Sequence, residues 1–258
     1  PHVETSDINS RRVRKLLREA DPRIGLCCGW TQLITADVRE IPDDGILGFH
    51  FSPLPRGRGG APVNWQIING HDEVGVSLFR LVGEVDHGEI FGQTTVPIET
   101  RDDVSTVYNR LTNATCSVLD EVLPQIATRS IEPTEQSFEH ASYYPRRKPV
   151  DGLIDWERSA DKQFNWIRAQ TKPYPGAFTF YEGKKVTIWQ STPRDEKTDA
   201  VSGTVLRCEP GGGVDVSSGG EVLRLERVEL HGEAPAWGDS FAARHDVGCG
   251  DRFGEPSD

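Results

Sequence analysis

The sequence predicts an α/β domain with a mostly parallel sheet and helices on both faces, followed by a small open β-barrel of the OB-like kind. Two observations predict this order. Helical and strand-like hydrophobic periods alternate along residues 1–145, as expected when helices cover a parallel sheet. Short β-type runs separated by glycine-rich turns then dominate residues 161–258, which is typical of a small barrel. We expect residues 146–160 to link the two domains.

The first domain opens with a helix and two strands. Apolar residues recur at helical spacing over residues 8–20, and the Asp-Pro pair at 21–22 ends that helix. Residues 24–28 and 45–50 are short, uninterrupted apolar runs, as expected for strands that are buried on both faces. The second of these strands ends at His50.

The rest of the first domain continues the alternation. A helix is predicted over residues 61–69, because a proline near its start is tolerated in the first turn. Residues 74–81 alternate like a strand, and residues 89–96 predict another. Residues 103–122 carry the longest apolar stripe at helical spacing, which predicts the longest helix of the chain.

The second domain starts with a helix over about residues 159–170. Its predicted strands are short and cover residues 177–181, 185–189, 201–207, 214–216 and 221–229. Glu182 and Gly183 lie between the first two of them and predict a two-residue hairpin turn.

Composition and charge exclude several classes of protein. The formal net charge is −11, and residues 161–258 hold 12 Lys and Arg against 16 Asp and Glu. Because phosphate contacts need clustered basic residues, nucleic acid is not expected as the main partner. No apolar run is long enough to span a membrane, and no secretory signal is visible. Five cysteines without zinc-type spacing indicate free thiols, so we expect a cytoplasmic protein.

The densest group of chemistry-bearing residues begins where the second predicted strand ends. His50 lies at that C-terminal end, where ligands bind in open α/β sheets, and a proline- and glycine-rich loop follows over residues 51–62. Asp86 follows the next strand and would supply the carboxylate that orients and charges an imidazole. Taken alone, His50 also fits a hydrogen-bonded histidine at a strand end, and Asp86 also fits a simple turn. For each residue, the catalytic and the purely structural interpretation both stay open on this pattern alone.

Residues 45–93 resemble the core of the folate-dependent formyltransferases. That family includes methionyl-tRNA formyltransferase, the aminosugar-nucleotide formyltransferases and glycinamide ribonucleotide transformylase. Its shared pattern is Asn-x-His, Ser-Leu-Leu-Pro, Arg-Gly and a later Asp-x-Gly. The matching residues are His50, Ser52-Pro53-Leu54-Pro55, Arg58-Gly59 and Asp86-His87-Gly88. Residues 151–178 are similar to the junction and the start of the C-terminal domain in the tRNA and aminosugar branches.

This resemblance implies a Rossmann-like catalytic domain that transfers a formyl group from 10-formyltetrahydrofolate to a primary amine. His50 would stabilise the oxyanion of the tetrahedral intermediate. Asp86 would hold the imidazole and help to move a proton from the amine towards N10 of the folate. Gly48 stands where the family has its Asn, so one hydrogen-bond donor is missing, and such a loss costs about 10²–10³ in rate. Asn64, a water or a backbone N–H near Ser52 would replace it.

The same resemblance assigns binding residues. The pterin pocket would be lined by Trp30, Leu33, Ile34 and Val85, although Trp30 also fits a core aromatic. The substrate side would be formed by Ser52, Leu54, Pro55, Arg58 and Gly59. No metal site is predicted, because His87 and His140 lack partners at ligand spacing.

Two acceptor amines compete. Residues 60–65 and 173–178 resemble the aminosugar branch more closely, and the acidic C-terminal region agrees, because a tRNA-binding enzyme should present a basic face. We therefore expect a nucleotide-linked aminosugar, with methionyl-tRNA as the alternative. A weakly active or inactive folate-binding relative is a further alternative, which Gly48 suggests.

The beginning of the chain is unusual, because it starts with Pro1 and contains no Met. If the family alignment holds, one βαβ unit would precede the sequence. A membrane partner is not expected, and the sequence leaves a homodimer open.

Overall fold

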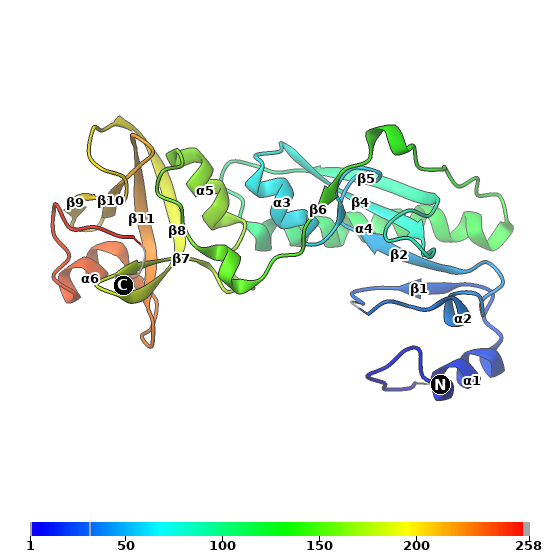
Figure 1. Ribbon diagram of the computed structural model, residues 1–258. Coiled ribbons are helices and arrows are strands. Elements are labelled where there is room, and N and C mark those ends of the chain that lie inside the picture. Colours follow the sequence, from blue (N-terminus) through cyan, green and yellow to red (C-terminus); the bar gives the residue numbers. More distant parts are fainter. Residues whose placement is uncertain (1, 31, 255–258) are drawn as a thin grey trace. The chain divides into compact units, whose positions relative to one another are not determined.

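The computed structural model describes residues 2–30 and 32–254, which form two compact units (Figure 1). The first unit contains the residues up to 62 together with residues 73–97 and 109–146. The second unit contains residues 63–72 and 98–108 together with the residues from 147 onward. None of the described helices is both long and apolar enough to cross a membrane.

A four-stranded sheet forms the centre of the first unit, and its order is β1 (Gly25–Cys27), β2 (Ile46–His50), β4 (Glu73–Arg80) and β5 (Ile90–Pro97). Only β1 and β2 are parallel, whereas β2–β4 and β4–β5 are antiparallel. The prediction of a mostly parallel sheet is therefore wrong. Residues 81–89 alone join β4 to β5, and a parallel crossover needs a dozen residues or more.

Helices pack against this sheet, as the alternating pattern predicts. Val38 of α2 (Ala36–Arg39) packs with Ile34 and Ile46, and Leu17 of α1 (Arg11–Ala20) joins this small core. The helix α4 (Val104–Thr128) lies so close to β5 that a side chain on Gly92 would meet Val122 at 2.7 Å.

Two sequence-based predictions, the burial of the first strand and the end of the longest helix, differ from the structure. Strand β1 is an edge strand whose Leu26 is exposed, so it is not buried on both faces. Helix α4 continues past Pro124 to Thr128, beyond the predicted end at residue 122. A proline inside a helix removes one backbone hydrogen bond, which the rest of this long helix tolerates.

A short ribbon joins two distant loops of the first unit. Strand β3 (Arg58–Gly59) pairs in parallel with β6 (Tyr143–Tyr144), and the 3₁₀ helix η1 (Phe138–His140) precedes β6. Strands of two residues carry no periodicity, so the sequence did not predict them. The ribbon ties the loop after His50 to the segment after α4. Helix α3 (Pro62–Ile68) follows β3, as predicted.

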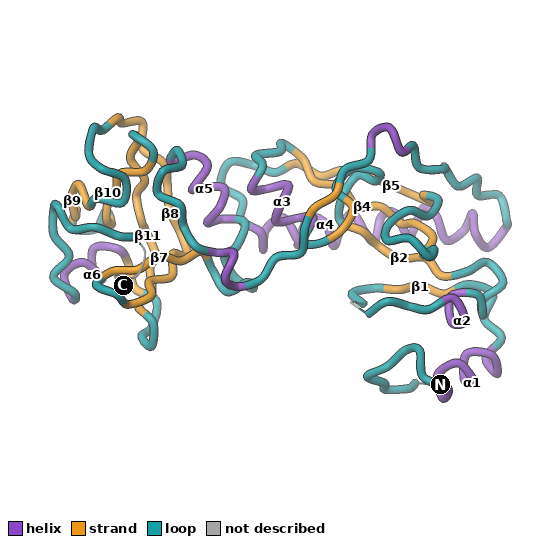
Figure 2. The backbone as a smooth tube through the Cα atoms, in the orientation of Figure 1, coloured by secondary structure: helices purple, strands orange, loops and turns teal. Residues whose placement is uncertain are grey.

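The second unit is built on an antiparallel sheet, shown in orange in Figure 2. Its strand order is β7 (Ala177–Tyr181), β8 (Lys184–Lys197), β11 (Glu221–Leu230), β10 (Gly213–Ser218) and β9 (Val205–Glu209), with β12 (Ala236–Trp237) beside β11. Glu182 and Gly183 form the predicted turn between β7 and β8, with φ of 47° and 72°. Positive φ at both residues is the requirement of the turn type that joins tight hairpins.

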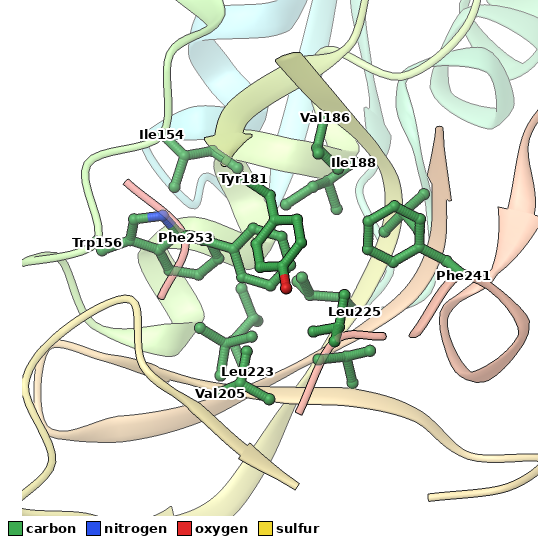
Figure 3. Close-up of a cluster of buried hydrophobic side chains, with 14 of the residues drawn as sticks. Ile154, Trp156, Tyr181, Val186, Ile188, Val205, Leu223, Leu225, Phe241 and Phe253 are labelled. Carbon is green, nitrogen blue, oxygen red and sulfur yellow. The ribbon is translucent and has the colours of Figure 1, made fainter. Parts of the chain in front are cut away.

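The core of the second unit lies between the sheet and its helices (Figure 3). Ile188, Leu223 and Leu225 come from the strands, and Phe241 comes from α6 (Gly238–Arg244). The helix α5 (Ala160–Arg168) also packs on this core, and the 3₁₀ helix η2 (Pro149–Gly152) precedes it in the chain. Short segments at sheet edges, such as β12, were not predicted.

The C-terminal tail covers both edges of this sheet. The amide of Gly254 donates to the carbonyl of Phe180 in β7, at 3.0 Å. The amide of Phe253 donates to the carbonyl of Gly203, just before β9, at 2.9 Å. Both open edges therefore find backbone partners, which removes the tendency of free edges to pair with other chains.

Candidate active site

His50 ends strand β2 with a buried side chain, 7% exposed. Its Nε2 donates to the carbonyl oxygen of Gly57 at 2.8 Å. Its Nδ1 lies 3.5 Å from Oδ2 of Asp86, whose side chain is also largely buried. The structure thus brings together the two residues that the sequence predicts as the reacting pair.

Both ring nitrogens of His50 face oxygen acceptors, a carbonyl and a carboxylate. Nε2 carries the proton that the carbonyl of Gly57 accepts. A second proton on Nδ1 would let the charged imidazole pair with the carboxylate of Asp86.

Asp86 lies in the connection between β4 and β5, in the left-handed region with φ of 58°. Its Oδ2 accepts the backbone N–H of Gly59 at 2.8 Å. A side chain on Gly59 would meet the carbonyl oxygen of Tyr144 at 2.4 Å, and one on Gly88 would meet that of Arg80 at 1.8 Å. These close approaches explain why glycine follows Arg58 and stands two residues after Asp86.

Ser77 and Gln93, which face each other on β4 and β5, hold the loop that follows His50. The hydroxyl of Ser77 donates to the carbonyl of Ser52 at 2.7 Å and accepts the amide of Leu54 at 3.2 Å. Nε2 of Gln93 donates to Ser77 Oγ at 2.7 Å and to the carbonyl of Leu54 at 3.0 Å. Sequence reasoning missed both residues. A serine inside the apolar run of β4 was the available signal.

Arg58 is fully buried, which is rare for a guanidinium. Its Nε and Nη2 donate to Oε1 of Gln136 at 3.1 and 2.7 Å, and its Nη1 donates to the hydroxyl of Tyr143 at 2.9 Å. The rings of Phe138 and Tyr143 lie 5.4 and 5.7 Å from the guanidinium carbon. Within residues 2–30 and 32–254, no carboxylate forms an ion pair with Arg58.

Three of the five residues predicted on the substrate side are buried, which indicates a supporting role for their side chains. The side chains of Ser52, Leu54 and Arg58 are 0%, 3% and 0% exposed, so they support the loop from inside the unit. Pro55 accepts the amide of Ser142 through its carbonyl, and Gly59 donates to Asp86. We therefore assign no substrate contact to the side chains of Ser52, Leu54 and Arg58.

Three of the four residues predicted to line the pterin pocket are exposed. Trp30 is 38%, Leu33 65% and Val85 59% exposed, so their apolar surfaces are open to a ligand. Ile34 is buried with Val38 and Ile46 and serves the small core instead. Residue 31, inside the same predicted loop, lies outside the described residues.

Gly48 and His50 share one face of β2, because alternate residues of a strand point the same way. A side chain on Gly48 would meet Cδ2 of Leu81 at 2.7 Å, so Leu81 fills the place where the family's Asn would begin. Asn64 belongs to the second unit, where its Nδ2 donates to the carbonyl of Ala169. This donor is therefore already engaged, and Asn64 as the substitute donor stays a prediction.

His87 joins a second polar cluster beside Asp86. Its Nδ1 lies 2.8 Å from Oε2 of Glu84, and its Nε2 lies 2.6 Å from the hydroxyl of Tyr143, which also accepts from Arg58. Sequence analysis considered His87 only as a metal ligand and did not predict this cluster, because Tyr143 is distant in sequence and lies in β6 of the β3–β6 ribbon.

Comparison with protein families gives two matches. Residues 2–123 match the model described as formyl transferase, and residues 147–246 match the model of the formyl transferase C-terminal domain. The two models together account for most of the chain.

One curated relative is similar over most of this chain. The bifunctional polymyxin resistance protein ArnA of Wigglesworthia glossinidia brevipalpis is 36% identical over 210 residues, which are 81% of this chain. The chain spans only about a third (32%) of that relative's length.

Solved structures with a similar fold include HypX from Aquifex aeolicus in complex with tetrahydrofolic acid, with a TM-score of 0.70 and 19% identity over 92% of this chain and 42% of that one. They also include WlaRD, a sugar 3N-formyl transferase in the presence of dTDP and 5-N-formyl-THF, with a TM-score of 0.62 and 21% identity. The match covers 84% of this chain and 77% of WlaRD.

Proposed function

The chain belongs to the formyl transferase family, and we propose that it transfers a formyl group from 10-formyltetrahydrofolate to a primary amine. The observation that carries the proposal is the pair of His50 and Asp86. The two side chains approach to 3.5 Å in a site that excludes most water. An acid–base pair of this kind is what proton transfer during amine attack requires.

The formyl donor supplies an activated one-carbon group when it is bound. Its pterin ring is planar, with polar edges and flat π faces, and the exposed Trp30, Leu33 and Val85 offer apolar surfaces for those faces. Ile34 is buried with Val38 and Ile46, so we do not propose that it touches the ring.

His50 would supply a positive N–H to the formyl oxygen as negative charge develops on it. In the structure Nε2 donates a hydrogen bond to the carbonyl oxygen of Gly57. This hydrogen bond must open, or be shared, before Nε2 can donate to the formyl oxygen. Asp86 would stabilise the imidazole when the ring is charged, and its carboxylate is held by the amide of Gly59. The carboxylate would receive the proton that leaves the attacking amine and pass it towards N10 of the folate. The bond between N10 and the formyl carbon then breaks, and protonated N10 leaves as tetrahydrofolate.

For the acceptor we propose a nucleotide-linked aminosugar. The motifs at residues 60–65 and 173–178 support this choice, as does the net negative charge of residues 161–258. A similar fold in WlaRD, a sugar 3N-formyl transferase, is compatible with it. A tRNA acceptor would require a basic surface for its phosphates.

We also propose that residues 1–145 act as the catalytic domain, residues 146–160 as a linker and residues 161–258 as an accessory domain. The antiparallel sheet of the second unit, with its tail over both edges, is compatible with a small OB-like barrel.

The experiment is an acceptor panel. The protein is incubated with 10-formyltetrahydrofolate and UDP- or dTDP-linked aminosugars, with charged initiator tRNA in a parallel reaction, and mass spectrometry detects the formylated product. A formylated sugar supports the proposal. Product on tRNA alone would keep the chemistry and reject the sugar acceptor. Donor binding without any product would reject enzymatic activity and leave a folate-binding relative.

A further inference from the structure

We propose that Gln136 is a positioning residue, which fixes the turn of Asp86 so that its carboxylate meets both His50 and Gly59. This inference deepens the proposed function and rests on it for the catalytic consequence. The geometric part concerns the side chains alone and does not depend on the acceptor.

Gln136 uses every hydrogen-bonding position of its side-chain amide. Nε2 donates to the carbonyl of Asp86 at 2.9 Å and to the carbonyl of Gly88 at 2.6 Å. Oε1 accepts both Nε and Nη2 of Arg58. The opposite orientation would point Oε1 at two carbonyl oxygens, so these partners define which atom is the nitrogen. The residue is 8% exposed, so water does not compete strongly for these bonds.

The two carbonyls that Gln136 holds lie on either side of His87, at the turn where Asp86 has a left-handed φ of 58°. A non-glycine residue in that region costs about 1–2 kcal/mol, although Asp tolerates it better than most. The pair of hydrogen bonds offsets this cost. It also fixes the direction in which the Asp86 side chain leaves the backbone.

Arg58 completes the support. It is fully buried without a carboxylate partner within the described residues, and Gln136 is the acceptor of two of its N–H groups. The next residue, Gly59, donates to Oδ2 of Asp86. One chain of contacts therefore runs from Arg58 through Gln136 to the Asp86 backbone, and a second runs from Gly59 to the Asp86 carboxylate. Together these contacts hold the backbone carbonyl and the side-chain carboxylate of Asp86.

The test uses Gln136→Glu in the full chain. The carboxylate keeps an acceptor for Arg58 and now neutralises its charge, but when ionised it has no N–H for the carbonyls of Asp86 and Gly88. Two opposing effects act on stability, because the buried guanidinium gains a counter-charge while the carbonyls of Asp86 and Gly88 lose their donor. The thermal unfolding midpoint therefore serves to show that the variant folds. If Gln136 served the fold alone, neither the Gly59 exchange rate nor kcat would change in a folded variant.

The direct readout is amide hydrogen exchange resolved by NMR. The Gly59 N–H should exchange at least 10-fold faster in Gln136→Glu, because its acceptor on Asp86 is displaced. The Gly60 N–H donates to the carbonyl of Tyr144 in the β3–β6 ribbon and serves as the internal control, with no change expected. Gln136→Asn keeps the amide but shortens its reach, and it should give the same change if the glutamate variant does not fold.

Kinetics test the catalytic consequence. With the acceptor that the wild-type protein formylates, we expect kcat to fall at least 10-fold while KM for the formyl donor stays within twofold. A folded variant with an unchanged Gly59 exchange rate and an unchanged kcat would overturn the proposal. If the wild-type protein transfers no formyl group at all, the proposed function fails, and the Gly59 exchange rate still decides whether Gln136 positions Asp86.

Discussion

The Nε2 nitrogen of His50 donates to the carbonyl oxygen of Gly57 at 2.8 Å, so the imidazole is held by the backbone of the loop that follows it. Gly57 has a φ of 69°, which favours glycine. A side chain there would meet Cε2 of Tyr144 at 2.8 Å and Cβ of Ser52 at 3.1 Å. The position of His50 therefore depends on a glycine seven residues later in the chain.

Gly57→Ala is expected to lower both stability and turnover. The left-handed backbone alone costs about 1–2 kcal/mol for a residue with a Cβ, and the contact with Tyr144 adds to this. Because the carbonyl moves, His50 loses its partner, and kcat should fall more than KM for the formyl donor rises. Chemical unfolding and steady-state kinetics measure the two effects. A variant with wild-type stability and kcat would show that this loop does not position the imidazole.

Restoring the missing donor should raise the rate. Gly48→Asn alone must displace Leu81, whose Cδ2 lies 2.7 Å from the new Cβ. The double variant Gly48→Asn with Leu81→Ala removes that obstacle, and we expect an increase in kcat of about tenfold or more, since one such donor is worth about 10²–10³. Leu81→Ala alone is the matched control. A folded double variant no faster than this control would mean that another group already supplies the hydrogen bond.

Ser77→Ala tests the support beneath the loop after His50. The hydroxyl donates to Ser52 and accepts from Leu54 and Gln93, so its removal leaves buried polar groups without a partner. The free energy of unfolding should fall by about 1–3 kcal/mol. Ser117→Ala removes an exposed hydroxyl that bonds within its own helix and should change stability by about 0.5 kcal/mol at most. Urea unfolding compares the two variants, and equal effects would contradict the account.

Acid should weaken the second unit through Asp215. Burial by itself would raise the pKa of this carboxyl, but the hydrogen bond and charge of Arg224, with those of Arg207, hold the pKa below its ordinary value of 3.8. A lowered pKa means that the carboxylate stabilises the fold above pH 3.8 and that this contribution is lost as the pH falls through the folded-state pKa.

Asp215→Asn should therefore cost on the order of 3 kcal/mol at pH 7, because it leaves two guanidinium groups without their buried partner. The difference from the wild type should shrink below the ordinary pKa of the carboxyl. Guanidinium or urea unfolding at pH 7 and at pH 3 measures it. A difference that stays constant between these pH values would show that the ion pairs of Asp215 do not contribute as described.

The sequence predicted most helices and strands, because their apolar periods are set by burial on one face. The hairpin at Glu182 and Gly183 was predicted for a physical reason, since a glycine between two β-type runs supplies the positive φ that a tight turn needs. Hydrophobic pattern does not set strand direction, because the run in β4 has the same pattern beside a parallel or an antiparallel neighbour. The connection to β5 was the available signal, since residues 81–89 are too few for a parallel crossover.

The candidate site was predicted in part. His50 ends a strand, Asp86 lies in the connection that follows the next strand, and both side chains can take part in acid–base chemistry, so the pair was visible in the sequence. Gln136 was not, because its role depends on a contact with Arg58, 78 residues away in the sequence. Burial of Arg58 likewise left no trace in its local sequence, where a charged residue in a glycine-rich loop favours an exposed side chain.

The measurement that tests the central claim most directly is single-turnover formyl transfer by His50→Asn and Asp86→Asn, with His140→Asn as an exposed histidine control. The acceptor is the one that the wild-type protein formylates. The account predicts that each of the first two variants loses about 10²–10⁴ of the transfer rate while still binding the formyl donor, and that the control keeps the wild-type rate. Transfer at the wild-type rate by a folded His50→Asn variant would contradict the account.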